Sequence, residues 1–120
     1  MDIKVLTTTD VPHGYIADII THLEMTEKPA LTKLPSTLSI EKWPDPDPQD
    51  YLAMFRKVGE PWLWLSRLLL TEDELKVEIH DQDVEIFRVM ENNHPVGFIE
   101  LDFRTNGHCE IGFFGLIKEL

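Results

Sequence analysis

The chain has 120 residues, of which 42% are hydrophobic, and its net charge at pH 7 is −11, with 22 acidic against 11 basic side chains. This length allows one domain at most, and three Trp, six Phe and two Tyr predict a packed core. The negative charge argues against a nucleic-acid partner, whose phosphates would be repelled. It favours a basic acceptor, such as an amine or a lysine-rich protein, although solubility alone explains the same charge.

The sequence gives no support for membrane, secreted or metal-binding classes. No apolar run approaches the ~20 residues of a membrane span, and Asp2 and Lys4 interrupt any apolar block of signal-peptide type. Cys109 is the only cysteine, so we expect a cytoplasmic protein without an intrachain disulfide and interpret Cys109 as an inert core thiol. One cysteine and five scattered histidines do not make a zinc-ligand pattern, so no metal is expected.

The N-terminal third of the chain predicts strands separated by loops. Residues 1–14 are interpreted as an extension, or as a short strand followed by a turn at its Pro-His-Gly end. Alternating apolar side chains predict a strand over residues 15–26. Prolines indicate a loop over residues 27–37, and alternation resumes in a second strand over residues 38–43.

Helix signals fill the middle of the chain. Asp47 as the cap and Pro48 at the first helical position predict a helix that ends near Gly59. Pro61 opens a further helical segment. The sequence at residues 71–74, Thr-Glu-Asp-Glu, matches a capping box and predicts that another helix begins there.

The C-terminal third predicts three antiparallel strands. They run from Val84 to Glu91, from Val96 to Arg104 and from Cys109 to Leu116. Turn residues separate the first two, and Asn106-Gly107 is a strong hairpin signal between the last two. The predicted fold class is therefore α+β, with a mixed, mostly antiparallel sheet and with helices between the second strand and this three-strand β-meander.

Four local sequences are the most distinctive motifs of the chain. They are His22-Leu23-Glu24-Met25-Thr26, Gly59-Glu60-Pro61-Trp62-Leu63-Trp64, Leu70-Thr71-Glu72-Asp73-Glu74-Leu75 and Cys109-Glu110-Ile111-Gly112-Phe113-Phe114-Gly115-Leu116. In this order, and with these predicted elements, they resemble one bacterial subgroup of the GNAT family of acetyl-coenzyme A-dependent N-acetyltransferases. The resemblance covers roughly residues 15–120, which are interpreted as the N-terminal portion of an acetyltransferase domain.

The resemblance implies where the cofactor would bind. In the family the pantetheine arm of acetyl-coenzyme A lies alongside the fourth main strand, which assigns cofactor contacts to the backbone of Phe114, Gly115 and Leu116. A bulge usually splays that strand, and Gly112 and Gly115 suit one, although relief of crowding explains the same glycines. A backbone N–H at the bulge would stabilise the oxyanion of the reaction.

The resemblance also implies the reacting side chains. Glu110 occupies the family's acidic position and is interpreted as the general base that deprotonates a primary amine, with an exposed structural carboxylate as the alternative. The family's acceptor pocket assigns substrate contacts to Glu60 and Trp62, while Trp64 is assigned to the core. Weaker candidates for the base are Glu100, Asp102 and Glu24.

The family's glycine-rich phosphate-binding turn would follow Leu120, and Lys118 stands where the family often has proline. We therefore expect little or no binding of acetyl-coenzyme A, and little activity, from these residues alone. An uncovered half-sheet would leave apolar side chains and a strand edge exposed, which predicts homo-oligomers formed through that strand or face. The alternative to an acetyltransferase is a non-catalytic interaction or dimerisation module on the same scaffold.

Overall fold

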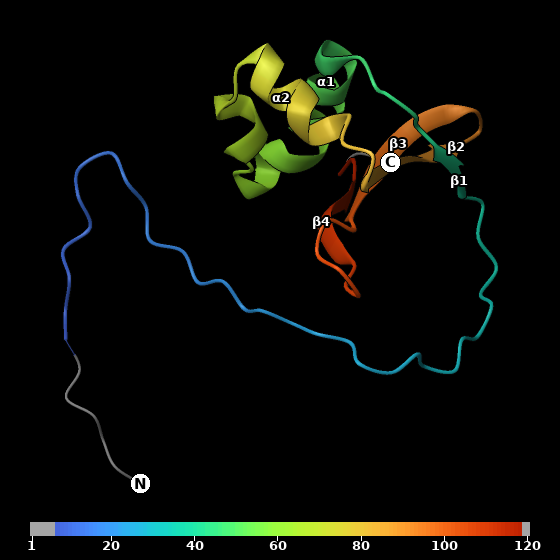
Figure 1. Cartoon of the computed structure of the whole chain (residues 1–120), viewed down its shortest axis with the longest axis horizontal. Coiled ribbons are helices and arrows are strands. Elements are labelled where there is room, and N and C mark those ends of the chain that lie inside the picture. Colours follow the sequence, from blue (N-terminus) through green and yellow to red (C-terminus); the bar gives the residue numbers. More distant parts are fainter. Residues whose placement is uncertain (1–6, 119–120) are drawn as a thin grey trace, which may run out of the picture. The chain divides into compact units, whose positions relative to one another are not determined.

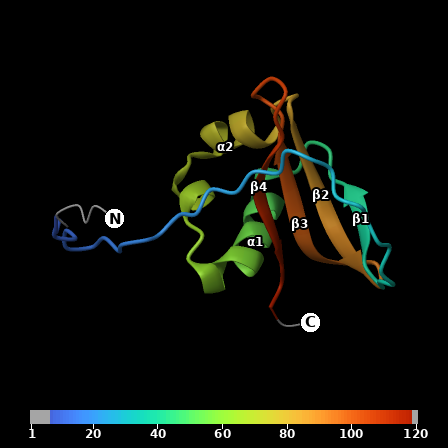
Figure 2. The same cartoon turned by 90° about the horizontal axis from the view of Figure 1, so that it is seen from below.

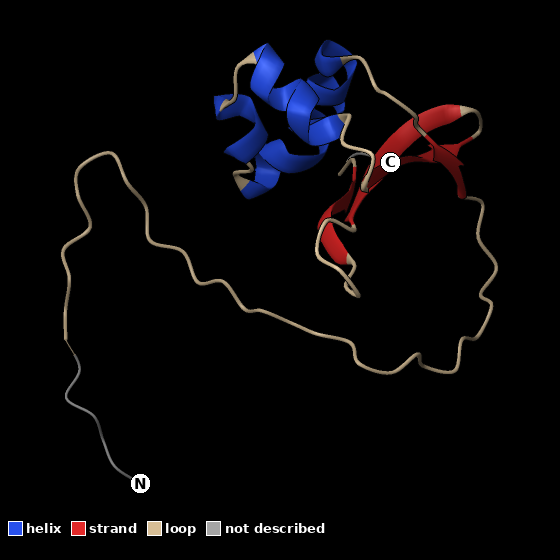
Figure 3. Ribbon diagram, viewed as in Figure 1, coloured by secondary structure: helices blue, strands red, loops and turns tan. Residues whose placement is uncertain are grey.

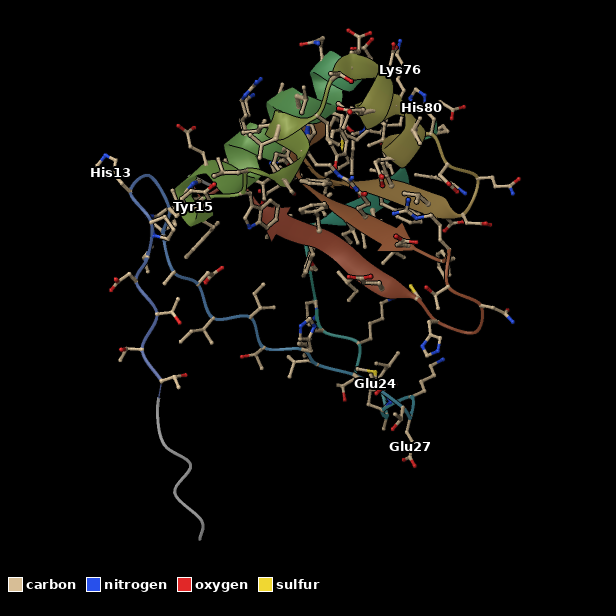
Figure 4. The ribbon with its side chains drawn as sticks, turned by 60° about the vertical axis from the view of Figure 1, so that its left-hand side comes forward. His13, Tyr15, Glu24, Glu27, Lys76 and His80 are labelled. Carbon is tan, nitrogen blue, oxygen red and sulfur yellow. The ribbon has the colours of Figure 1, made fainter. Side chains whose placement is uncertain are left out.

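The computed structural model describes residues 7–118, and the chain divides into two compact units, residues 1–33 and residues 34–120 (Figure 1). The short strand expected within residues 1–14, at residues 3–6, lies outside the described residues. In the first unit the predicted turn is confirmed, because the Tyr15 N–H donates to the Pro12 carbonyl over 3.1 Å. Side chains of this unit, among them His13, Tyr15, Glu24 and Glu27, project from a chain without regular structure (Figure 4).

The strand predicted over residues 15–26 is wrong. Residues 16–26 contain no helix or strand, and the side chains of Ile19 and Leu23 are each 91% exposed. A strand is stable only when its backbone hydrogen-bonds to a neighbour, and alternation of apolar residues cannot supply that neighbour.

The second unit is an α+β domain built on an antiparallel sheet, as predicted. Its strands are β1 (Ser39–Lys42), β2 (Val84–Glu91), β3 (His94–Asp102) and β4 (Glu110–Leu116), and they are hydrogen-bonded in the order β1-β2-β3-β4. Every pairing among the described strands is antiparallel, so the sheet is simpler than the mixed one expected. The predicted β-meander is confirmed, with hairpin turns at Asn92-Asn93 and around Gly107 that use left-handed backbone conformations.

The helices form where the sequence places their caps (Figure 3). Helix α1 (Pro48–Gly59) begins after Asp47, whose carboxylate accepts the N–H groups of Gln49 and Asp50 at 2.9 and 3.3 Å. Helix α2 (Glu72–Ile79) begins with the predicted capping box. The segment that Pro61 opens is two short 3-10 helices, η1 (Glu60–Trp62) and η2 (Ser66–Leu69), with Leu63 in a left-handed conformation just after η1.

Both helices pack on one face of the sheet, which we call the helix face (Figure 2). Helix α1 buries Tyr51, Phe55 and Val58 there, and Phe98 of β3 is fully buried beneath them. Phe55 contacts the ring of Phe113 in β4 edge-on, with ring centroids 5.1 Å apart. Because side chains alternate along a strand, this packing fixes which β4 residues point toward the helices.

Neither helix of the second unit packs on the other face of the sheet, which we call the open face. Ile40, Val89, Gly97 and Leu116 form one cross-strand row on it, since each pairs with the next. Phe114 pairs with Ile99 on the same face, and its side chain is 58% exposed. The open face therefore presents exposed apolar side chains at both edges of the sheet. Neither α1 nor α2, the helices of the described chain, has the length and apolarity needed to cross a membrane.

Candidate functional site

Strand β4 is an edge strand, since it pairs only with β3 among the described residues. Just after β4, the Ile117 N–H donates to the Val96 carbonyl over 2.7 Å, so Ile117 faces β3 with its backbone groups. In an antiparallel pair this orientation alternates, so the backbone of Phe113 and Gly115 also faces β3. The N–H and C=O groups of Phe114 and Leu116 therefore point away from β3, toward an edge that no described strand covers.

A bulge interrupts β4 at Gly112, as predicted. Phe113 pairs with Glu100 and Ile111 pairs with Leu101, so Gly112 is an extra residue on β4. A Cβ at Gly112 would lie 3.6 Å from the Glu100 carbonyl oxygen, an ordinary contact. The bulge therefore does not depend on the absence of a side chain at this position.

Gly115 has a packing role. A Cβ at this position would overlap Val58 of α1 and would lie 3.4 Å from the Trp64 ring. Glycine therefore lets α1 and the Trp64 ring approach the backbone of β4 closely. Relief of crowding, the alternative left open by the sequence, explains Gly115, although the crowding comes from Val58 and Trp64 and not from the adjacent phenylalanines.

Glu100 lies at the centre of a buried polar cluster on the helix face. Its side chain is 2% exposed, and its carboxylate accepts the Tyr51 hydroxyl and the Arg67 guanidinium, each over 2.5 Å. Burial raises the pKa of Tyr51, and the Glu100 carboxylate raises it further. Burial opposes the charge of Arg67, but the attraction of Glu100 outweighs it, so the pKa of Arg67 is raised. The cluster ties α1, η2 and β3 together.

The cluster continues by ion pairs to Asp102 of β3, the strand partner of the first residue of β4. Glu78 of α2 binds Arg67 at 3.3 Å and Arg104 at 3.0 Å, and Arg104 binds Asp102 at 2.7 Å. Hydrogen bonds from Arg104 lower the pKa of Asp102. Asp102 pairs with Glu110, so the two carboxylates stand on the same face. Arg104 thus offsets the negative charge of Asp102, which lies next to Glu110, the predicted base.

The structure places the predicted site residues in two groups. Glu110 is exposed at the start of β4, and the predicted cofactor contacts Phe114, Gly115 and Leu116 lie at its other end. At about 3.3 Å per residue, Glu110 and Gly115 are roughly 16 Å apart along the strand. Glu60 and Trp62 are exposed in η1, near the segment in which Trp64 contacts the Gly115 end. The structure therefore does not bring Glu110 to the predicted acceptor residues.

The structure contradicts the prediction for Cys109 and confirms the prediction for Trp64. Cys109 is exposed just before β4, so its interpretation as a core thiol is wrong, because the residue belongs to the hairpin end and not to the buried part of the strand. Trp64 is half-buried against Phe55, Phe98 and Phe113, which confirms its assignment to the core.

Residues 7–118 contain no group of three His, Cys, Asp or Glu side chains placed to hold a metal ion. His80 follows α2, as Figure 4 shows, and its Nε2 lies 2.8 Å from the Pro46 carbonyl oxygen, so it ties α2 to the loop before α1. Two surface hollows lie away from β4, one beside Glu91 and one between Trp43 and His80.

Neither described helix provides a phosphate site. An open helix N-terminus attracts anions, but Asp47 already occupies the N–H groups that begin α1. The first turn of α2 carries Glu72, Asp73 and Glu74, which repel a phosphate. The described residues therefore fit the amide-bearing arm of a coenzyme A ligand at the β4 edge but do not fit its pyrophosphate.

Comparison of the chain with protein-family models, with curated proteins and with solved structures finds no match. The structure therefore defines a fold class only. The second unit is an α+β domain with two helices on one face of an open four-strand antiparallel sheet.

Proposed function

We propose that this chain is the N-terminal portion of an acetyl-coenzyme A-dependent N-acetyltransferase. The observation that carries the proposal is the edge of β4, where a bulge at Gly112 is followed by outward-facing backbone groups at Phe114 and Leu116. An extended ligand with two amide bonds, such as pantetheine, can bind such an edge as an added strand does. The order of elements and the sequence motifs of β4 support the same assignment.

In the proposed reaction, the residues of this chain would have separate roles. The outward backbone groups of Phe114 and Leu116 orient the pantetheine arm, and acetyl-coenzyme A supplies an activated acetyl thioester when bound. A backbone N–H at the Gly112 bulge stabilises the oxyanion. Glu110 lies two residues away, about 7 Å along the strand, and takes the proton of a primary amine through a water molecule. The acidic surface attracts a cationic amine, from a small molecule or from lysine.

We expect binding by residues 1–120 alone to be weak, with a dissociation constant of about 1 mM or above, because the described residues do not fit the pyrophosphate. The test is a titration of the ¹⁵N-labelled chain with millimolar acetyl-coenzyme A. We expect amide shift changes confined to β4, largest at Phe114 and Leu116, with a thermal shift near zero.

Adenosine 3′,5′-bisphosphate is the matched control ligand, because it has the nucleotide and lacks the pantetheine arm. It should leave the β4 amides unchanged. The variant Leu116→Pro is the matched protein control, because it removes an outward N–H without removing a hydrogen bond to β3. Shift changes that avoid β4, or that the nucleotide alone reproduces, would contradict the proposal.

A second candidate function is a non-catalytic interaction or dimerisation module. The exposed apolar side chains of the open face favour it, since such surfaces mark protein contacts. Under either function we infer a cytoplasmic protein that does not bind nucleic acid or membranes, on the basis of the single cysteine and the net charge of −11.

A further inference from the structure

Strand β3 carries a bulge directly opposite the end of β4 that we assign to the pantetheine arm. In the pairing with β2, Val89 lies opposite Gly97 and the next residue of β2 lies opposite Pro95, so Val96 is an extra residue of β3. The Val96 carbonyl accepts the Ile117 N–H over 2.7 Å. Because a bulge bends its strand and increases the local twist, this one sets the direction in which β3 meets the end of β4.

Gly97, the next residue of β3, allows β4 to approach more closely than a side chain would permit. A Cβ at Gly97 would overlap the Gly115 carbonyl oxygen. It would also lie 2.8 Å from the Leu116 side chain and 3.1 Å from the Leu116 Cα. The overlapping group is backbone, which cannot rotate aside as a flexible side chain can. A larger residue at position 97 would therefore move this end of β4 away from β3.

The same segment of β4 is also held from the helix face. The Val58 side chain and the Trp64 ring pack against Gly115 on that face. The Gly115 carbonyl oxygen lies on the open-face side of β3, where the Cβ of residue 97 would be. This backbone is thus enclosed on both faces, although it lies near the end of an edge strand, where fraying is common. Close contact at Gly115 therefore fixes the spacing and direction of the outward N–H groups of Phe114 and Leu116.

We propose that Gly97 is a positioning residue for the cofactor edge of β4. It contacts no ligand itself, but its lack of a side chain places β4 where Phe114 and Leu116 present their N–H groups to an extended ligand. The positioning of a cofactor rests on the proposed function. The effect of Gly97 on the conformation of β4 does not, so the two are tested separately.

Amide hydrogen exchange tests the conformational effect in the natural chain, in Gly97→Ala and in Gly112→Ala. In the natural chain, we expect Gly115 and Ile117 to exchange as slowly as Phe113. Gly97→Ala should abolish the protection of Gly115 and Ile117, whereas the amides of β2 should stay protected. Gly112→Ala is the matched control, because a Cβ there makes only an ordinary contact of 3.6 Å, and it should keep the natural pattern.

Two outcomes of this experiment would overturn the proposal. One is natural protection of Gly115 and Ile117 in Gly97→Ala, because β4 would then tolerate a side chain at position 97. The other is fast exchange at Gly115 and Ile117 in the natural chain, because the end of β4 would then not be held against β3. The second outcome needs no variant, so the proposal remains falsifiable if Gly97→Ala does not fold.

A titration of the ¹⁵N-labelled proteins with acetyl-coenzyme A tests the positioning role. At equal ligand concentration, Gly97→Ala should lower the shift changes at Phe114 and Leu116 about tenfold. Tyr51→Phe is the control for lost stability, because it weakens the buried cluster around Glu100 and keeps Gly97, and it should preserve these shift changes. Shift changes of natural size in Gly97→Ala, or an equal loss in Tyr51→Phe, would overturn the role. No response in the natural chain would contradict the proposed function, and hydrogen exchange would still decide whether Gly97 positions β4.

Discussion

Replacing Glu100 by alanine is expected to lower the free energy of unfolding by about 3–5 kcal/mol. The substitution leaves the largely buried Arg67 guanidinium without its closest carboxylate, and leaves the Tyr51 hydroxyl without its acceptor. Glu78 remains within 3.3 Å of Arg67 but is partly exposed and cannot replace Glu100. Urea unfolding followed by circular dichroism measures this loss.

Glu110→Ala is the matched control, because Glu110 is an exposed glutamate on the adjacent strand. It should change the free energy of unfolding by no more than about 0.5 kcal/mol. Tyr51→Phe removes one buried hydrogen bond and keeps the ring, and should cost about 1–2 kcal/mol. A cost for Glu100→Ala as small as that for Glu110→Ala would show that the buried cluster does not hold the helices to the sheet.

Trp64→Ala is expected to lower the free energy of unfolding by about 3 kcal/mol, whereas Trp62→Ala should change it by about 0.5 kcal/mol or less. The Trp64 ring packs against the rings of Phe55 and Phe113, with centroids 5.6 and 5.4 Å apart. The Trp62 side chain is 68% exposed. Thermal and urea unfolding of both variants measure the difference.

The two tryptophans lie two residues apart, so each variant serves as the control for the other. Equal costs would contradict the assignment of Trp64 to the core and of Trp62 to the surface. If Trp62→Ala changes the free energy of unfolding only slightly, the fold does not need this side chain. Trp62 is then available to contact an acceptor, as the sequence resemblance implies.

Local signals in the sequence were sufficient for most of the second unit. Asp47 and Thr71 mark both helix starts, because a cap satisfies backbone N–H groups within a few residues of itself. Asn106-Gly107 marks the last hairpin for a similar reason, since Gly107 takes the left-handed conformation that the turn needs. Such features depend on neighbouring residues and are visible without a fold.

Features that depend on distant residues were harder to predict. Residues 15–26 carry an apolar alternation, but a strand also needs a partner that the alternation does not identify. A lone cysteine without a histidine partner favours an inert core thiol, but the position of Cys109 beside the hairpin turn leaves it exposed. Strand β3 is His94–Asp102 and not the predicted Val96–Arg104, because His94 and Pro95 already pair with β2.

The largest omission was the structural role of Glu100. From the sequence, Glu100 is only a weak candidate for the base, whereas the structure shows a buried carboxylate bound to Tyr51 and Arg67. One signal in the sequence indicates that Glu100 is buried, because alternation along β3 places it on the same inward side as Phe98, two positions earlier. Its partners are 49 and 33 residues away in the chain, and spacing alone does not connect them.

The central claim is that the backbone of β4 offers Phe114 and Leu116 to a ligand or to a second strand, and keeps Phe113 and Gly115 bonded to β3. Residue-resolved amide hydrogen exchange on dilute, monomeric chain tests it most directly. We expect fast exchange at Phe114 and Leu116 and slow exchange at Phe113 and Gly115. Equal protection at all four amides would contradict the account.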